Sequence, residues 1–144
     1  MKYLLDADLL IKAYDKEQTE AKNRLRELLQ DQNNSFAITP MITYEVLCGI
    51  PWVDTDKHTR IKTVLARLES ISIDTVIGDT DERFFRYCRH RDRKLRNTAT
   101  RSEHKFDYFH FIVAKTYGLA IATDNAIDFD AMENAYRDYL SEMP

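Results

Sequence analysis

The chain has 144 residues, of which 44% are hydrophobic, and a net charge of −3 at neutral pH. That is enough apolar material for one domain with a proper core, and three Gly and three Pro predict a helix-rich chain without long linkers. No apolar run approaches the roughly 18 residues of a membrane span, and acidic residues interrupt any N-terminal leader. Cys48 and Cys88 form no disulfide framework. We therefore expect a single cytoplasmic domain over residues 1–144.

The first half of the chain alternates between strand and helix patterns. In chain order we predict a strand at 2–5, helices over 9–14 and 17–30, a strand at 36–38, and helices over 40–49 and 56–70. Asp8 suits the N-cap of the first helix. Thr39, followed by Pro40, suits the N-cap of the third.

The second half continues this alternation. We predict a strand at 71–76, a helix that starts at 79–81, a loop at 97–102, a helix over 106–117 closed by Gly118, a strand at 119–122 and a helix over 128–140. Strands that alternate with helices indicate an α/β sandwich with a mainly parallel central sheet. Ligand sites in such sheets form outside the carboxyl ends of the strands. Asp6 and Asp124 both follow predicted strands, so we expect them to face one crevice.

Four carboxylates are each isolated at the end or edge of an apolar segment. They are Asp6, Glu45, Asp107 and Asp124. Burying a carboxylate is costly unless a cation or hydrogen bonds compensate it. Four converging carboxylates would repel one another and bind a hard cation such as Mg²⁺ or Mn²⁺. This pattern favours metal-dependent chemistry on phosphate esters.

Each carboxylate also has a local explanation that the sequence leaves open. Asp6 can cap the helix that follows it, and Glu45 can occupy the surface of an amphipathic helix. Asp107 suits the positive end of a helix dipole. Asp124 can begin a turn with Asn125.

The order and spacing of these acidic motifs resemble the PIN domain family, and in particular VapC-type toxins. The first segment, 4–11, is similar to the family's opening strand–Asp–helix motif, and 39–49 resembles the second, with its Glu four residues before Gly. The stretch from Asp107 to Asp124 matches the third and fourth motifs in spacing, and Asp128 with the Phe after it matches a pair that often follows. The resemblance runs from residue 2 to about residue 129.

This resemblance implies a PIN-like α/β/α sandwich and a Mg²⁺- or Mn²⁺-dependent endoribonuclease. Its catalytic and metal-binding carboxylates would be Asp6, Glu45, Asp107 and Asp124. The implied substrate is RNA, for example tRNA or rRNA, hydrolysed at its phosphodiester bonds. The resemblance also implies a homodimer and a cognate antitoxin that blocks the site, as in a type II toxin–antitoxin pair.

Three features depart from the family pattern. Asp8 stands where Asn or Ser is more usual, and bulky residues fill 110–112. The C-terminal stretch 130–140 predicts a helix where a closing strand is often found. None of these departures removes an implied ligand.

Further positions extend the candidate site. Asp8 adds a fifth carboxylate in the first motif, and Asp128, in the Asp–Phe pair that follows the fourth motif, is a further acid. Thr123 can hydrogen-bond a ligand or a phosphate oxygen, or can simply be a β-branched strand residue. His110 shares a helix face with Asp107, but we expect a partly buried, hydrogen-bonded histidine.

Basic residues concentrate in one segment. Between Arg83 and Lys105 there are nine basic residues and two acidic ones, so this segment carries +7 and the rest of the chain −10. Such a charge excess favours a polyanion such as RNA, with an acidic protein partner or a solvated surface as alternatives. The RNA-binding candidates are Arg89, Arg91, Arg93, Lys94 and Arg96.

Two other functions remain open. Asp6 and Asp8 mimic the acid pair of a haloacid-dehalogenase-type phosphohydrolase, with Asp124 and Asp128 as its late acids. That alternative leaves Glu45 and Asp107 without a role, and the chain is short for that fold. The second alternative is a non-catalytic PIN-like module that binds RNA or protein.

Overall fold

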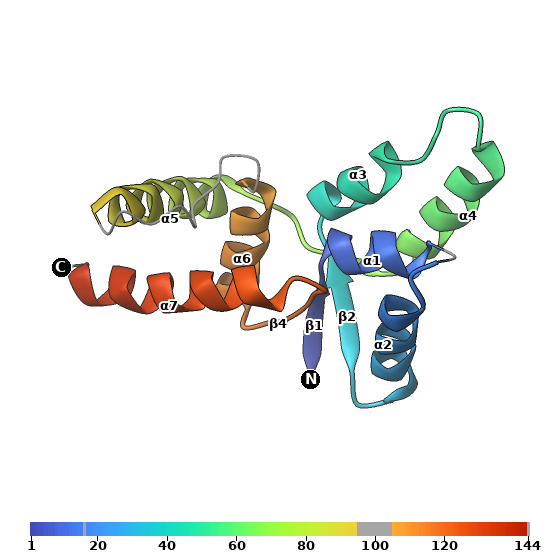
Figure 1. Ribbon diagram of the computed structural model, residues 1–144, viewed down its shortest axis with the longest axis horizontal. Helices are drawn as coiled ribbons and strands as arrows, with labels where there is room; N and C mark the ends of the chain where they lie inside the picture. The colour runs from blue at the N-terminus through green and yellow to red at the C-terminus, as the bar shows by residue number, and fades with distance from the viewer. Residues whose placement is uncertain (16, 95–104, 144) are drawn as a thin grey trace. The chain divides into compact units, whose positions relative to one another are not determined.

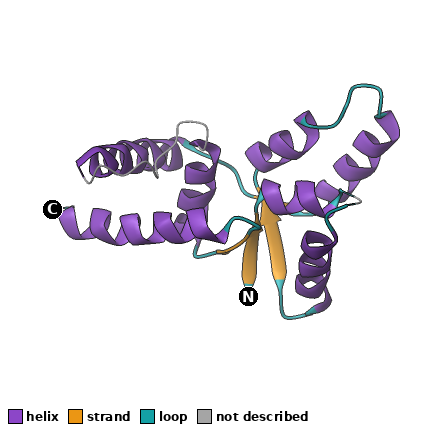
Figure 2. Cartoon of the chain, viewed as in Figure 1, coloured by secondary structure: helices purple, strands orange, loops and turns teal. Residues whose placement is uncertain are grey.

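The computed structural model describes residues 1–15, 17–94 and 105–143, and the side chains of residues 93 and 94 lie outside that description. The chain is a helix-rich α/β protein whose internal contacts define two compact units. The sheet unit comprises Met1–Ser72 and Leu119–Asp124. The helical unit comprises Ile73–Gly118 and Asn125–Pro144. All the described strands, which are orange in Figure 2, belong to the sheet unit.

The sheet unit is built on four parallel strands in the order β3-β2-β1-β4. They are β1 (Lys2–Leu5), β2 (Ser35–Ile38), β3 (Glu69–Ser70) and β4 (Ala120–Ala122). Tyr3 of β1 is in register with Phe36 of β2 and with Ala120 of β4. The prediction of a mainly parallel sheet is confirmed, because every strand pair is parallel. The carboxyl ends of β1 and β4 therefore lie side by side.

Four helices complete this unit (Figure 1). They are α1 (Ala7–Ala13), α2 (Thr19–Gln30), α3 (Pro40–Cys48) and α4 (Thr55–Leu65). The predicted cap of α3 is confirmed: the buried Thr39 hydroxyl accepts a hydrogen bond from the Ile42 amide at 3.2 Å, and Pro40 occupies the first turn. This cap fixes the start of the helix that carries Glu45.

The helical unit packs three helices around aromatic side chains. They are α5 (Thr75–Lys94), α6 (Lys105–Tyr117) and α7 (Ala126–Glu142). Phe84 of α5 is fully buried, and its ring lies 5.5 Å from the ring centroids of Phe111, Tyr136 and Tyr139. Gly118 ends α6 as predicted, with φ at 66°, a left-handed conformation that favours glycine.

Several predicted boundaries are wrong. The helix expected over 56–70 ends at Leu65, and the predicted strand at 71–76 is absent, since the strand there is Glu69–Ser70. Helix α5 begins at Thr75, before the predicted start at 79–81. The reason is local: the Asp74 carboxylate accepts from the Ile77 amide at 2.9 Å and so caps the helix earlier. The predicted loop at 97–102 lies outside the described residues.

Asp8 does not cap the first helix. Helix α1 begins at Ala7, so Asp8 lies in its first turn and Asp6 occupies the N-cap position. The helix expected from residue 17 begins at Thr19. The helix predicted over 128–140 is confirmed within α7. Among the described residues, no helix is both long and apolar enough to cross a bilayer.

Candidate functional site

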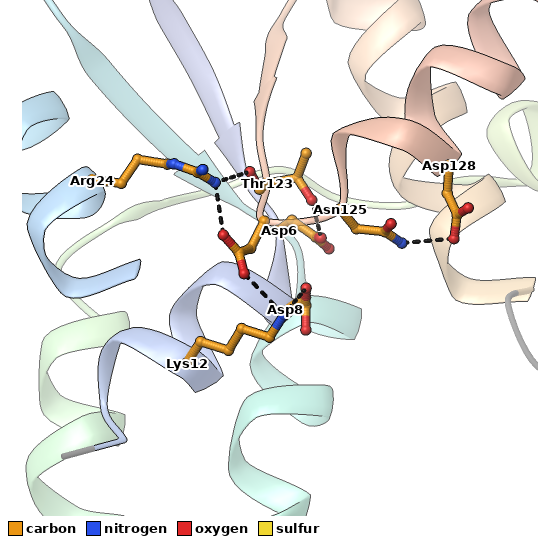
Figure 3. Close-up of polar contacts among 8 residues, drawn as sticks. Asp6, Asp8, Lys12, Arg24, Thr123, Asn125 and Asp128 are labelled. Atoms are coloured by element: carbon orange, nitrogen blue, oxygen red, sulfur yellow. Dashed lines mark hydrogen bonds and ion pairs between the residues drawn. The ribbon is translucent and has the colours of Figure 1, made fainter. Parts of the chain in front are cut away.

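Asp6 lies directly after β1 and is almost completely buried. Its amide donates to the Ala122 carbonyl at 2.9 Å, so the pairing of β1 with β4 continues to this residue. The Asp6 side chain is 2% exposed, and its Oδ2 accepts a 2.7 Å hydrogen bond from the Thr123 hydroxyl (Figure 3). Although Asp6 occupies the N-cap position of α1, its side chain makes no capping hydrogen bond. The local explanation of Asp6 as a helix cap is therefore wrong.

Asp124 lies two residues beyond β4 and is held by two cations. Its Oδ2 accepts from Lys12 Nζ at 2.9 Å, and its Oδ1 accepts from Arg24 Nη1 at 2.7 Å (Figure 3). The hydrogen bond from Lys12, more than the charge of Arg24, holds the pKa of the Asp124 carboxyl below its usual value. Asp124 is therefore a fixed anion within the sheet unit.

Asp8 is compensated by the same lysine. Its carboxylate lies 3.4 Å from Lys12 Nζ, one helical turn further along α1. The hydrogen bond from Lys12 to Asp124 is the main cause that raises the pKa of Lys12, and Asp8 adds to it. The extra acid at position 8 is thus matched by a cation. The sequence analysis did not identify Lys12 or Arg24 as partners of these acids. The four-residue spacing from Asp8 to Lys12 could have predicted the first ion pair, because residues four apart are neighbours on a helix.

Glu45 lies on α3 in the sheet unit and is half-buried, one residue before the buried Val46. The sequence also allowed Glu45 to lie on the exposed surface of an amphipathic helix, and its side chain is only partly exposed. Its helix is fixed by the Thr39 cap described above.

Asp107 and His110 form a pair within the helical unit. They lie one turn apart on α6, and each offers a ligand atom within 4.8 Å of the other's. Asp107 is half-buried, whereas His110 is fully buried, more than the partly buried histidine that the sequence predicted. A carboxylate and an imidazole at this separation suit a divalent metal ion. Asp107 also lies in the first turn of its helix, so the favourable helix dipole remains part of its setting.

Asp128 lies in the first turn of α7, in the helical unit. Its Oδ2 accepts a hydrogen bond from Asn125 Nδ2 at 2.8 Å, and this contact replaces a side-chain cap by Asn125 (Figure 3). The described contact of Asp128 is therefore local to the start of its own helix.

The predicted RNA-binding cations that the structure describes are engaged within the helical unit. The Arg89 guanidinium lies 5.5 Å from the centroid of the Phe85 ring, and Arg91 donates to Asp138 at 3.1 and 2.9 Å. Arg93 and Lys94 belong to the last turn of α5, but their side chains, like all of Arg96, lie outside the described residues. Arg89 thus packs on an aromatic ring of its own helix, whereas Arg91 forms an ion pair between α5 and α7.

The helical unit also buries acids that the sequence reasoning did not single out. Asp81 is 5% exposed, and its Oδ1 has no hydrogen-bond partner within the described part of the chain. Burial raises the pKa of Asp81 to about 7, although the charge of His110 opposes this shift. Burial, reinforced by Asp92, raises the pKa of the Cys88 thiol to about 12. The signal was available: Asp81 stands three and seven residues before the apolar Phe84 and Cys88, on the same helix face.

Comparisons with known proteins show the fold. No protein-family model and no curated protein matches the chain. A solved structure, one chain of a toxin–antitoxin complex from Klebsiella pneumoniae, is similar with a TM-score of 0.58 at 20% sequence identity. The likeness covers 88% of this chain and 89% of that one. The helix-rich α/β architecture is therefore shared along nearly the whole chain.

Proposed function

We propose that the protein is a metal-dependent endoribonuclease and the toxin of a toxin–antitoxin pair. The observation that carries this proposal is Asp6, a carboxylate that is 98% buried at the carboxyl end of a parallel strand. Functional sites in parallel sheets gather at such strand ends. The similar chain from a toxin–antitoxin complex supports the same direction.

The proposed cation is Mg²⁺ or Mn²⁺, held by the four carboxylates Asp6, Glu45, Asp107 and Asp124. Oxygen ligands of this kind suit both ions. When bound, the ion lowers the pKa of a coordinated water and neutralises charge on the scissile phosphate. His110 is a further candidate ligand, because it offers a nitrogen close to the Asp107 carboxylate.

The chain's own residues have distinct parts in this proposal. The Thr123 hydroxyl fixes the Asp6 carboxylate by donating to its Oδ2. Asp124, whose two oxygens each accept from a cation, would supply a fixed negative charge to the set that holds the ion. Asp8, which is paired with Lys12, adds no independent charge to the set.

The proposal includes partners. A cognate antitoxin would block the site, and the toxin would form a homodimer. Both follow from the family resemblance, and the similar chain, which comes from a toxin–antitoxin complex, supports the first.

The test is RNA cleavage by the purified chain. Structured tRNA and total RNA are each incubated with Mg²⁺ or Mn²⁺, with EDTA as the metal-free control. We expect metal-dependent cuts, and Asp6→Asn should reduce the rate by roughly 100-fold or more, because it removes charge without changing volume. Asp56→Asn is the matched control, since Asp56 is an exposed acid of α4 in the same unit. Equal rates for wild type and Asp6→Asn would contradict the proposal.

Other outcomes decide between the alternatives. Covalent phosphorylation of Asp6 by a phosphomonoester would support the phosphohydrolase. Tight RNA binding by a folded, metal-loaded chain that makes no cuts would support the non-catalytic module.

A further inference from the structure

Arg24 of α2 is anchored close to Asp6 by one end of its guanidinium. Its Nη1 donates to Asp124 Oδ1 at 2.7 Å and to the Thr123 carbonyl at 3.1 Å. The hydroxyl of the same Thr123 donates to Asp6 at 2.7 Å, so a single residue links the arginine to the buried carboxylate (Figure 3). All these residues belong to the sheet unit.

The other edge of this guanidinium is available. Arginine has five N–H donors, and the described contacts of Arg24 use only Nη1. Within the described part of the chain, Nε and Nη2 of Arg24 make no hydrogen bond or ion pair, and the side chain is 52% exposed. Nε and Nη2 present two parallel N–H groups, the geometry that matches two oxygens of a phosphate.

Stability alone does not account for this arrangement. An ion pair as exposed as that of Arg24 contributes little to the stability of the folded chain. What the contacts do achieve is orientation, because two acceptors on one nitrogen fix the plane of the guanidinium. Lys12 Nζ donates to the other oxygen of the Asp124 carboxylate at 2.9 Å, so this carboxylate is held between two cations.

We infer that Arg24 binds a backbone phosphate of the RNA through its Nε–Nη2 edge, with Asp124 and Thr123 as the residues that position it. This inference rests on the proposed function, in which Asp6 marks the cleavage site. A contact to phosphate carries no sequence information, so it places the RNA without selecting its bases. It adds an electrostatic contact in the sheet unit to those that the sequence predicts for the basic segment of residues 83–105.

The test is RNA binding without metal, which needs no cleavage. Binding of a fluorescein-labelled tRNA is followed by fluorescence anisotropy in EDTA over a range of salt concentrations. Arg24→Gln should weaken binding roughly tenfold and lower the magnitude of the salt slope by about one. Arg24→Lys keeps the charge but not the two-pronged edge, so its affinity should fall between those of wild type and Arg24→Gln.

Arg26→Gln is the matched control, because Arg26 is an exposed arginine two residues further along the same helix. It should bind RNA as wild type does. Unchanged affinity and salt slope in Arg24→Gln would overturn the inference, and so would wild-type affinity in Arg24→Lys, since charge alone would then suffice. Circular dichroism of each variant confirms that the fold is retained.

The two proposals fail separately. Metal-dependent cleavage that Asp6→Asn abolishes, together with an Arg24→Gln variant that binds normally, overturns the Arg24 contact and leaves the nuclease in place. An Arg24-dependent affinity without any cleavage supports the phosphate contact and overturns the nuclease.

Discussion

The two units place their acidic residues in opposite environments. In the sheet unit Asp124 lies beyond a strand end, between Lys12 and Arg24, and its pKa is lowered. In the helical unit Asp81 lies on the inner face of α5, and burial raises its pKa to about 7. The difference shows that the partners decide the state of a buried or half-buried acid, since cations stabilise the anion and apolar surroundings favour the neutral form.

The largest effect we predict concerns the aromatic packing of the helical unit. Phe84→Ala removes a fully buried ring that packs against four others, so it should lower the free energy of unfolding by about 3–5 kcal/mol. Urea unfolding followed by circular dichroism measures the change. Ile127→Ala, at an 83% exposed position of α7, is the control and should change stability by less than about 0.5 kcal/mol. A loss below about 1 kcal/mol in Phe84→Ala would mean that this core is not what stabilises the unit.

The second prediction uses the raised pKa of Asp81. In the unfolded chain this carboxyl ionises near its ordinary value of 3.8, whereas in the folded chain it keeps its proton up to about pH 7. The folded state therefore binds more protons between these values, and wild-type stability falls as pH rises through this window and levels off above it. Asp81→Asn stays neutral at every pH. Its stability relative to wild type should increase between pH 5 and pH 8, by at most about 3 kcal/mol.

Urea unfolding of both proteins at pH 5 and pH 8 tests this expectation. Two nearby groups interact electrostatically with Asp81: the charge of His110 on α6 lowers the pKa of Asp81, and Asp81 in turn raises the pKa of Cys88 on α5. If the difference in free energy of unfolding between variant and wild type stayed constant with pH, Asp81 would be ionised normally in the folded protein.

The sequence predicted those features of the fold that are determined by residues close together in the chain. The parallel sheet, the Thr39 cap and the Gly118 helix end follow from periodicity and from residues whose conformational preferences act within one turn. The strand expected at 71–76 failed for the same kind of reason, because the β-branched residues there were overridden by the Asp74 cap of α5.

The candidate site was predictable only in part. The position of Asp6 at the end of a strand was predictable because it stands directly after an apolar segment, and its contact with Thr123 follows from the adjacency of β1 and β4. Arg24 was not found, because the contact joins residues 24 and 124, a hundred positions apart. Ion pairs of this kind depend on tertiary packing, and no spacing rule within a single element predicts them.

The third prediction concerns the Thr39 N-cap of α3 in the sheet unit. Thr39→Ala removes the hydroxyl that accepts from the Ile42 amide, so a buried N–H loses its partner. Stability should fall by about 1 kcal/mol. Thr39→Ser keeps the hydroxyl and should retain most of the stability, which separates the loss of the cap from the loss of the methyl group. Equal losses in the two variants would assign the effect to packing.

The smallest effect belongs to Asp124, and its pH dependence should have the opposite sign to that of Asp81. Because the folded-state pKa of Asp124 is lowered, its ion pairs stabilise the protein above the unfolded value of 3.8, and this contribution is lost as pH falls through the folded value. Asp124→Asn should therefore be less stable than wild type at pH 7, by no more than about 1 kcal/mol, and should match it in strong acid. High salt should also narrow the gap at pH 7, because Lys12 and Arg24 are partly exposed. If the gap instead widened towards acid pH, the cations would not be what holds Asp124 ionised, and the contrast between the two units would lose its physical basis.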